Sequence, residues 1–193
     1  SFSFAAPPND TFVVGIPTDT RGLEPAQISS RHTANIMKHM FGQLYSVSAS
    51  GSIDPNLAES YSVSEDGKEY TFTLQEGLTC HDGEPLTAED AAYSFNRVAD
   101  PELAFTGNSA GFVYKSIDFI EARADSELDV TIVLGGPNHI ALGLISEIYV
   151  HCKGSYENMT KEEAATHPVG SGPYEVVKWD KGSKIVMKKT ANP

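Results

Sequence analysis

His81 and Asp82 are adjacent and form the most obvious pair for acid–base chemistry in this sequence. A histidine acts as a general base when a carboxylate orients it toward a nucleophile. The side chains of adjacent residues diverge in an extended or turning backbone, so this pair does not suit that role. Gly83 and Pro85, which follow at once, are typical of a turn. We therefore predict a structural turn here rather than an active site.

Ser171 lies in "VGSGPY", which invites comparison with the nucleophile motif of serine hydrolases. That motif is Gly-x-Ser-x-Gly between a strand and a helix, whereas here glycines flank the serine directly and a strand is predicted after it. His32 and His39 lie seven positions apart, without an HxxxH pattern or a carboxylate cluster that would indicate a metal site. The sequence thus predicts no catalytic residue, no metal ligand and no cofactor. A hydrolase using Ser171 or a histidine stays as an alternative.

Cys80 and Cys152 have no neighbouring cysteine, which excludes the spacings of zinc knuckles and redox motifs. Two isolated cysteines in a chain of this length are most often free and buried. A disulfide between them requires a fold that brings their Cα atoms within about 7 Å. Both alternatives remain open from the sequence.

The chain has 193 residues and a net charge of −12, with a pI near 4.8. An acidic surface repels phosphate, so nucleic acid and anionic membranes are not expected as partners. The lysines between 178 and 189 are interpreted as protection of strand edges rather than as a phosphate site. The longest apolar stretches, such as 140–145, are too short to span a membrane. The first ten residues lack the basic start and apolar core of a signal peptide.

Hydrophobic periodicity and turn residues predict a series of short elements in the first half of the chain. These are a buried strand at 11–17, a helix capped by Ser29 or Ser30 and running to about Gln43, a strand with a glycine turn at 45–53, a hairpin at 57–77 around Asp66-Gly67, and a helix from Thr87 to about Val98. Thr87 and Asp90 form a capping box at the start of that last helix, and its predicted inner stripe is Ala91, Ala92, Phe95, Val98 and Ala99.

The second half continues in the same manner. An irregular segment runs from Asp100-Pro101 to Gly111, and the later elements are two strands within 114–136, a short helix at 138–146, a strand at 147–151, a polar helix at 160–166 and two strands within 170–189. The alternation of short strands and helices predicts a mixed α/β protein.

Three segments, in this order, resemble one known family. They are "GLEPAQISSRHTANIMKHMFGQLYS", "LAESYSVSEDGKEYTFTLQEGLTCHDGEPLTAEDAAYSFNRVADP" and "GSGPYEVVKWDKGSKIVMKKTANP". They are similar to segments of family 5 extracellular solute-binding proteins, which are receptors of ABC importers for peptides, nickel complexes and related solutes. The resemblance implies an incomplete lobe of the type II periplasmic-binding-protein fold, mixed α+β, with an inserted β-rich subdomain. It implies that residues 1–45 and 168–193 belong to lobe one, that 46–167 form the inserted subdomain, and that the second lobe is absent.

For function, the resemblance implies a non-enzymatic module that captures a peptide or related small solute. Its expected partners are that solute and the membrane permease of an ABC importer, without nucleic acid, and a monomer is expected. The implied location is periplasmic or extracellular, with a lipid anchor in the native form as one option. A stand-alone interaction domain derived from the lobe is the alternative.

The resemblance also implies where a solute would bind. Two segments are expected to line the cleft, and the residues are Ser29, Ser30, Arg31, His32 and Thr33 in the first, Phe105, Asn108 and Phe112 in the second, and Tyr149 as a further candidate. Simpler roles stand beside these: Ser29 or Ser30 as a helix cap, Arg31 as a solvated charge, and Phe112 as a core residue.

Overall fold

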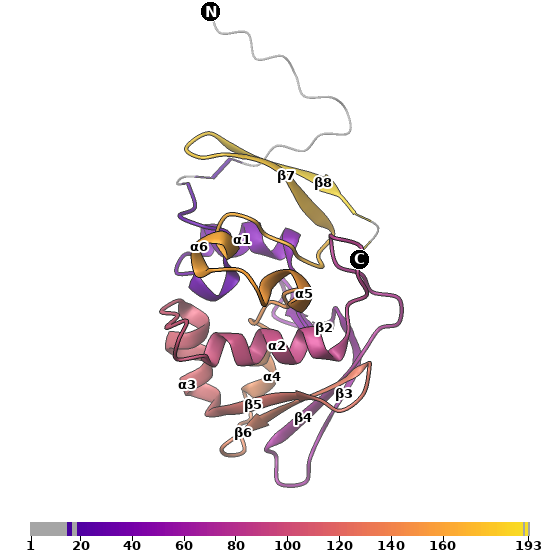
Figure 1. Cartoon of the computed structure of the whole chain (residues 1–193). Coiled ribbons are helices and arrows are strands. Elements are labelled where there is room, and N and C mark those ends of the chain that lie inside the picture. The colour runs from indigo at the N-terminus through magenta and orange to yellow at the C-terminus, as the bar shows by residue number, and fades with distance from the viewer. Residues whose placement is uncertain (1–14, 17–18, 191, 193) are drawn as a thin grey trace, which may run out of the picture.

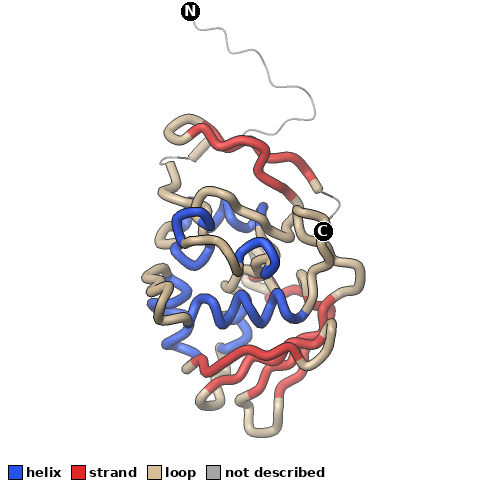
Figure 2. The backbone as a smooth tube through the Cα atoms, viewed as in Figure 1, coloured by secondary structure: helices blue, strands red, loops and turns tan. Residues whose placement is uncertain are grey.

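The computed structural model describes residues 15–16, 19–190 and 192. A four-stranded sheet lies at one end of the molecule, a two-stranded hairpin lies at the other, and helices lie between them (Figures 1 and 2). The helical elements are η1 (Pro25–Gln27), α1 (Arg31–Met40), α2 (Ala88–Ala99), η2 (Ser109–Val113), α3 (Tyr114–Ile117), α4 (Ala141–Ile145), α5 (Lys153–Tyr156) and α6 (Lys161–Ala164). The strands are β1 (Tyr45–Val47), β2 (Ile53–Pro55), β3 (Ala58–Val63), β4 (Glu69–Leu74), β5 (Phe119–Ala124), β6 (Asp129–Leu134), β7 (Tyr174–Asp180) and β8 (Lys184–Lys189). The mixed α/β class is confirmed.

The four-stranded sheet has the order β3-β4-β6-β5, and all neighbouring strands are antiparallel. Asp66 and Gly67 lie in the turn between β3 and β4, where Gly67 has a φ of +71° that glycine adopts without steric cost. Burial alternates along β4, so that Tyr70, Phe72 and Leu74 share the core face. The predicted hairpin and its inner face are therefore confirmed.

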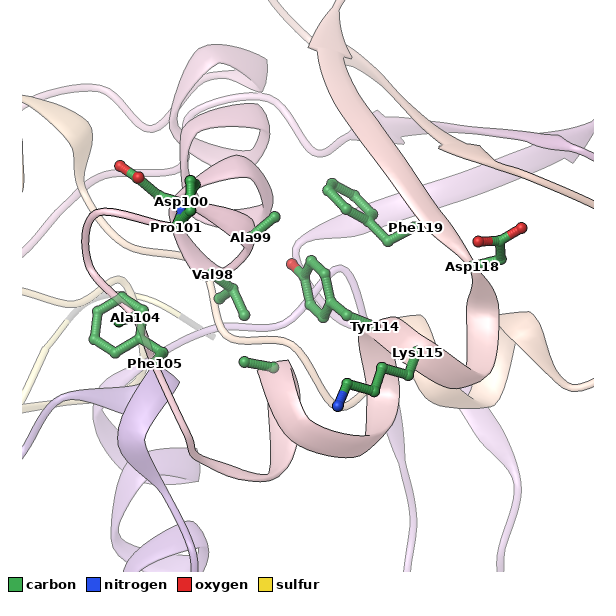
Figure 3. Close-up of a pocket in the computed structure, with 11 residues that line it drawn as sticks. Val98, Ala99, Asp100, Pro101, Ala104, Phe105, Tyr114, Lys115, Asp118 and Phe119 are labelled. Atoms are coloured by element: carbon green, nitrogen blue, oxygen red, sulfur yellow. The ribbon is translucent and has the colours of Figure 1, made fainter.

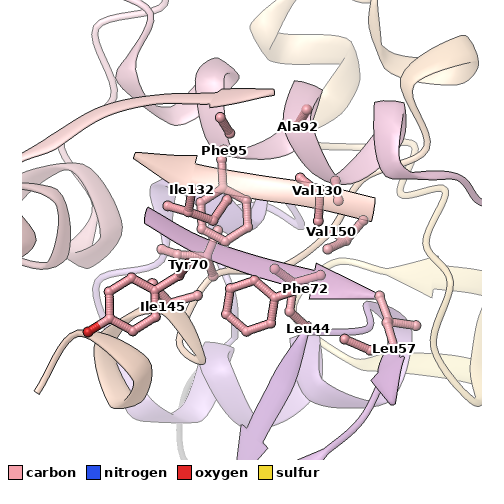
Figure 4. Packing of buried hydrophobic residues seen from close by; sticks show 14 of the residues in the cluster. Leu44, Leu57, Tyr70, Phe72, Ala92, Phe95, Val130, Ile132, Ile145 and Val150 are labelled. Carbon is pink, nitrogen blue, oxygen red and sulfur yellow. The ribbon is translucent and has the colours of Figure 1, made fainter. Parts of the chain in front are cut away.

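The helix α2 packs against the inner face of this sheet (Figures 1 and 4). It begins as predicted, because the backbone N–H and hydroxyl of Thr87 both donate hydrogen bonds to Asp90 Oδ2, at 2.8 and 2.9 Å. Phe95 is completely buried against the sheet, which stabilises the fold by about 2–3 kcal/mol. Ala99 was predicted to belong to the buried stripe and is exposed instead, because it borders an open pocket rather than the sheet.

A second hydrophobic cluster lies between α1 and the β7–β8 hairpin. Met37 and Met40 of α1 are buried in it, and Val176 and Ile185 of the hairpin pack against it. The predicted helix ends at Met40 and not near residue 43, because Phe41 adopts an extended conformation that leads the chain toward β1.

Two glycines let the chain pass directly over the end of α1. A Cβ atom at Gly170 would overlap the Met40 carbonyl oxygen, and one at Gly172 would lie 2.8 Å from the His39 carbonyl oxygen. Glycine is therefore required on both sides of Ser171, which gives "VGSGPY" a structural explanation.

Cys80 and Cys152 form a disulfide, and their Cα atoms lie 6.0 Å apart. Of the two alternatives that the sequence leaves open, pairing is the correct one. Both residues are buried, and the bond joins the turn at residues 80–83 to the start of α5. It closes a loop between positions 72 apart in the sequence.

The strand predicted at 147–151 is wrong, because only an isolated bridge between Tyr149 and Gln43 forms in the short link from α4 to α5. The segment after Pro101, predicted as irregular, contains the π-helix η2. The helices predicted at 138–146 and 160–166 are confirmed as α4 and α6.

The strand predicted at 11–17 lies largely outside the described residues, and the two described positions, Gly15 and Ile16, are exposed. The division into 1–45 with 168–193 and an inserted 46–167 stays a prediction. In the part of the chain that the structure describes, α2 is the longest helix, with 12 residues, and no helix is long and apolar enough to cross a bilayer.

Candidate functional site

The first nominated segment forms the start of α1. Ser29, Ser30, Arg31 and His32 are exposed, and Thr33 is half-buried. The Thr33 N–H donates a hydrogen bond to Ser30 Oγ at 3.2 Å, so the capping role is confirmed for Ser30. Ser29, Arg31 and His32 extend from the helix start toward solvent.

The second nominated segment leads from the end of α2 into η2. Phe105 is buried, Asn108 is exposed, and the ring of Phe112 is 57% exposed. The core role considered for Phe112 is therefore wrong. A large apolar ring in this position is available for contact with another molecule.

The structure places the two segments side by side. The Asn108 N–H donates to the Ile28 carbonyl oxygen at 2.8 Å. Gly107 approaches the first segment so closely that a Cβ atom there would overlap the Ala26 carbonyl oxygen. The Asn108 side chain also donates from Nδ2 to Glu147 Oε2 at 3.2 Å, which adds an exposed carboxylate to the group.

Residues 28–33, 105–112 and Glu147 are termed the rim. Their exposed groups include a hydroxyl, a guanidinium, an imidazole, an amide, a carboxylate and an aromatic ring. Such a set can hydrogen-bond and pack against a polar solute that carries both charges. Among the described residues of the rim, no hydrogen bond joins a hydroxyl to an imidazole.

Tyr149, the remaining nominated residue, lies beneath α1 and not on the rim. It is 6% exposed, and its hydroxyl donates to the Ala34 carbonyl oxygen at 3.1 Å. Burial raises the pKa of its phenol, so the group stays neutral in the physiological range. The structure thus gives Tyr149 a role in supporting α1.

A pocket of about 410 Å³ borders the rim at Phe105 (Figure 3). Its other walls come from the end of α2, from α3 and from the start of β5, and include Tyr114, Lys115, Asp118 and Phe119. Its volume lies within the range of small-molecule sites, which runs from about 300 to 1,000 Å³. The rim is therefore continuous with a concave surface on one side.

A buried ionic cluster lies under the rim. Glu24, Arg97 and His151 are between 1% and 4% exposed. Glu24 Oε2 accepts from Arg97 Nη2, and Glu24 Oε1 accepts from His151 Nε2, both at 3.0 Å. The guanidinium carbon of Arg97 lies 5.0 Å from the centre of the Phe105 ring and 5.6 Å from that of Tyr156. The cluster therefore contacts a nominated residue from below.

The ionisation of Glu24 depends on this surrounding charge. Burial is the largest single effect and by itself would raise its pKa. The charge and hydrogen bond of His151, the charge of Arg97 and the hydrogen bond from the Ala26 N–H together outweigh burial, so the pKa of Glu24 lies below its ordinary value. Glu24 is therefore a carboxylate at neutral pH and a full counter-charge for Arg97.

The turn at residues 80–83, termed the corner, uses its polar atoms on neighbouring backbone. His81 Nε2 donates to the Gly172 carbonyl oxygen at 2.9 Å, and Nδ1 accepts from the Gly170 N–H at 3.3 Å. Ser171 is 1% exposed, and its Oγ accepts from the Gly42 N–H at 3.2 Å. The turn predicted at the corner is confirmed. Among the described residues, no group of three or more His, Cys, Asp or Glu side chains is arranged to hold a metal ion.

Sequence reasoning missed four residues of this region. Glu24 lies between Leu23 and Pro25, in a pattern that does not indicate a buried charge. Arg97 directly precedes the buried Val98 on α2, so a charge near the buried stripe could have identified it. His151 and Glu147 carry no comparable pattern in the sequence.

Comparison with known proteins identifies relatives for most of the chain. The profile of bacterial extracellular solute-binding proteins, family 5 Middle, matches residues 52–192. The chain is 30% identical over 150 residues to the dipeptide-binding protein DppE of Bacillus subtilis (strain 168), covering 71% of this chain and 28% of that protein. It is 27% identical over 185 residues to the glutathione-binding protein GsiB of Escherichia coli O1:K1, covering 93% of this chain and 34% of GsiB.

The fold is similar to that of a solved binding protein. The structure of NikZ from Campylobacter jejuni in complex with Ni(L-His) superposes with a TM-score of 0.83 at 27% identity, over 94% of this chain and 36% of NikZ. The chain therefore spans roughly a third of the length of these relatives. Its described part corresponds to a portion of a type II periplasmic-binding-protein fold, as predicted.

Proposed function

The chain belongs to the bacterial extracellular solute-binding proteins of family 5, and from this premise we propose that its rim forms one side of a binding site for an amino-acid-derived solute. Capture of that solute, without a chemical reaction, would precede its delivery to the permease of an ABC importer. Members of the family are periplasmic or extracellular. A buried disulfide suits such a compartment, where oxidised cysteines persist. We expect the protein to act as a monomer.

The observation that carries this proposal is the contact between the two rim segments. The Asn108 N–H donates to the Ile28 carbonyl oxygen at 2.8 Å, although the two residues are far apart in the sequence. Segments that a fold joins at the surface, with exposed Arg31, His32 and Phe112, provide convergent polar and apolar contacts. This pattern is typical of a binding surface.

The solute class follows from the chemistry that the relatives' names share. A dipeptide, glutathione and a nickel–histidine complex all contain amino-acid groups with a carboxylate. Arg31 is exposed on the rim and can pair with a carboxylate through two parallel hydrogen bonds. The exposed carboxylate of Glu147 can accept hydrogen bonds from an amino group.

The experiment is a titration of the ¹⁵N-labelled 193-residue chain, followed by NMR. Glutathione and dialanine are the test solutes, and glucose is the control. Binding is expected to be weak, with a Kd of about 1 mM, because one side of a site provides few contacts. Peptide-induced shifts that concentrate on the amides of Ser29, Arg31, Asn108 and Phe112 support the proposal.

Three outcomes contradict it. Shifts confined to the β7–β8 hairpin place the solute elsewhere. Shifts with glucose and not with peptides refute the solute class. The absence of shifts with all three solutes, in a chain that gives a dispersed spectrum, favours the stand-alone interaction domain instead.

A further inference from the structure

We propose that Arg97 is a positioning residue, which fixes the two rim segments in one arrangement from below. This inference rests on the proposed binding function of the rim. Arg97 is 4% exposed, so it is not a residue that the solute contacts. Its effect on binding is transmitted to the first segment through Glu24 and to the second segment through Phe105.

The link to the first segment runs through Glu24. Arg97 Nη2 donates to Glu24 Oε2 at 3.0 Å. The other carboxylate oxygen accepts the Ala26 N–H at 3.0 Å and so starts the short helix η1. The chain leaves η1 at Ile28, whose carbonyl oxygen accepts the hydrogen bond from Asn108. The position of Arg97 thus determines where the first segment begins.

The link to the second segment runs through Phe105. The Arg97 guanidinium lies 5.0 Å from the centre of this ring, within the range of a cation–π contact. Lys161 of α6 lies 4.9 Å from the same ring and donates to the Leu103 carbonyl oxygen at 2.8 Å. Two cations from different helices therefore hold the ring at the start of the segment.

Stability alone gives a weak reason for this arrangement. In the part of the chain that the structure describes, Arg97 Nε and Nη1 have no hydrogen-bond partner. A buried ion pair of this kind contributes little compared with well-packed apolar residues of similar volume. A planar guanidinium does, however, fix the orientation of the groups around it, because it binds a carboxylate and stacks on aromatic rings in one geometry. The geometry therefore favours a role in positioning.

The test compares Arg97→Lys with Arg123→Lys. Arg123 is the matched control. Its Nη2 lies 3.0 Å from Glu69 Oε2, and this ion pair lies on the four-stranded sheet, outside the rim. The first readout needs no solute. It is hydrogen exchange of the Asn108 amide relative to the amide of Leu74 in β4, which donates to the carbonyl oxygen of Leu128, just before β6. Arg97→Lys is expected to accelerate exchange at Asn108 about tenfold relative to Leu74, whereas Arg123→Lys leaves the ratio unchanged.

The second readout is the Kd of glutathione from the NMR titration, expected to rise about fivefold in Arg97→Lys and to stay constant in Arg123→Lys. Gly107→Ala provides an independent route, because its Cβ would push the second segment off the Ala26 carbonyl oxygen. Gly107→Ala should raise both the exchange rate of the Asn108 amide relative to Leu74 and the Kd of glutathione, with the ionic cluster intact.

The inference is overturned if Arg97→Lys changes exchange at Asn108 and Leu74 in parallel, which indicates a global loss of stability. It is also overturned if Gly107→Ala weakens glutathione binding and Arg97→Lys does not. Failure of the proposed function is distinct from both results: the wild-type chain then shows no glutathione-induced shift, while the solute-free exchange ratio still reports on Arg97.

Discussion

At the corner, His81 uses both ring nitrogens to hold the backbone of Gly170 and Gly172, whereas on the rim Arg31 and His32 extend into solvent. Both regions contain histidine and charged residues, so residue type alone does not distinguish the structural corner from the proposed binding surface. The difference lies in what satisfies each polar atom. Buried polar groups must be paired, and pairing within the fold removes them from contact with a solute.

On the rim, the side chains of Arg31, His32 and Phe112 can extend into solvent because another layer holds the backbone. Glu24, Arg97 and His151 lie beneath it and are almost completely buried. At the corner, the turn residues themselves and the disulfide of Cys80 hold the backbone in place. A binding surface in this protein thus requires a separate support, and its removal should have a larger effect than changes at the surface.

The largest effect is expected for Glu24→Gln, which removes the counter-charge of Arg97. Breaking a buried ion pair leaves an uncompensated charge, and we expect a loss of up to about 5 kcal/mol in the free energy of unfolding at pH 7. Urea unfolding of both proteins measures this loss. A loss below about 1 kcal/mol would contradict the supporting role of the cluster.

The same pair of proteins tests the ionisation of Glu24. Its folded pKa lies below the ordinary value of 4.5, so its carboxylate stabilises the fold above that pH and the contribution disappears as the pH falls through the folded pKa. The difference between the two proteins should therefore shrink as the pH falls below about 4.5. Arg97 and His151 face position 24 in both proteins, so the comparison isolates the carboxyl group of Glu24. A constant difference would show that Glu24 does not titrate there.

The next effect concerns the corner. Replacing Cys80 and Cys152 by serine opens a loop between positions 72 apart, which should cost about 4 kcal/mol of unfolding free energy. The reason is the larger conformational freedom of the unfolded chain. Urea unfolding of the double variant gives the value, and reduced wild-type protein is the control and should lose a similar amount. A much smaller loss would mean that backbone contacts hold the corner without the bond.

Local patterns in the sequence predicted the elements that depend on local chemistry. The turn at Asp66-Gly67 and the start of α2 at Thr87 and Asp90 are correct because their residues lie within a few positions of one another. The helix end after Met40 and the isolated bridge at Tyr149 were missed, since contacts with distant segments decide both.

The support beneath the rim could not be predicted for the same reason. Glu24 is 73 positions from Arg97 and 127 from His151, and each charge in isolation reads as a solvated residue. The pairing of Cys80 with Cys152 also depends on the fold. The resemblance to a family selected the two rim segments, but the choice between a helix cap and a free hydroxyl at Ser30 required the structure.

A smaller effect is expected for His81→Ala, which leaves the buried Gly170 N–H without its partner. It also removes one of two donors to the Gly172 carbonyl oxygen, which still accepts from Thr190 Oγ1 at 3.0 Å. An unpaired buried group costs about 1–3 kcal/mol, and we expect a loss of about 2 kcal/mol in urea unfolding. His139→Ala is the control, since His139 is exposed and its loss should change stability by less than about 0.5 kcal/mol. Ester or peptide hydrolysis by the wild type that His81→Ala abolishes without unfolding would contradict the structural role.

The smallest effect on stability is expected on the rim itself. Phe112 is 57% exposed, so Phe112→Ala should change the free energy of unfolding by less than about 0.5 kcal/mol. Its ring is nevertheless the largest apolar group that the rim presents, and its loss should raise the Kd of glutathione about fivefold. Ile120→Ala is the matched control, because Ile120 is 59% exposed on β5 and lies outside the rim. If both variants weaken binding equally, the contact is a general property of exposed apolar groups. If only Phe112→Ala weakens it, at constant stability, the contrast between the free rim and the internally paired corner holds for binding as well as for structure.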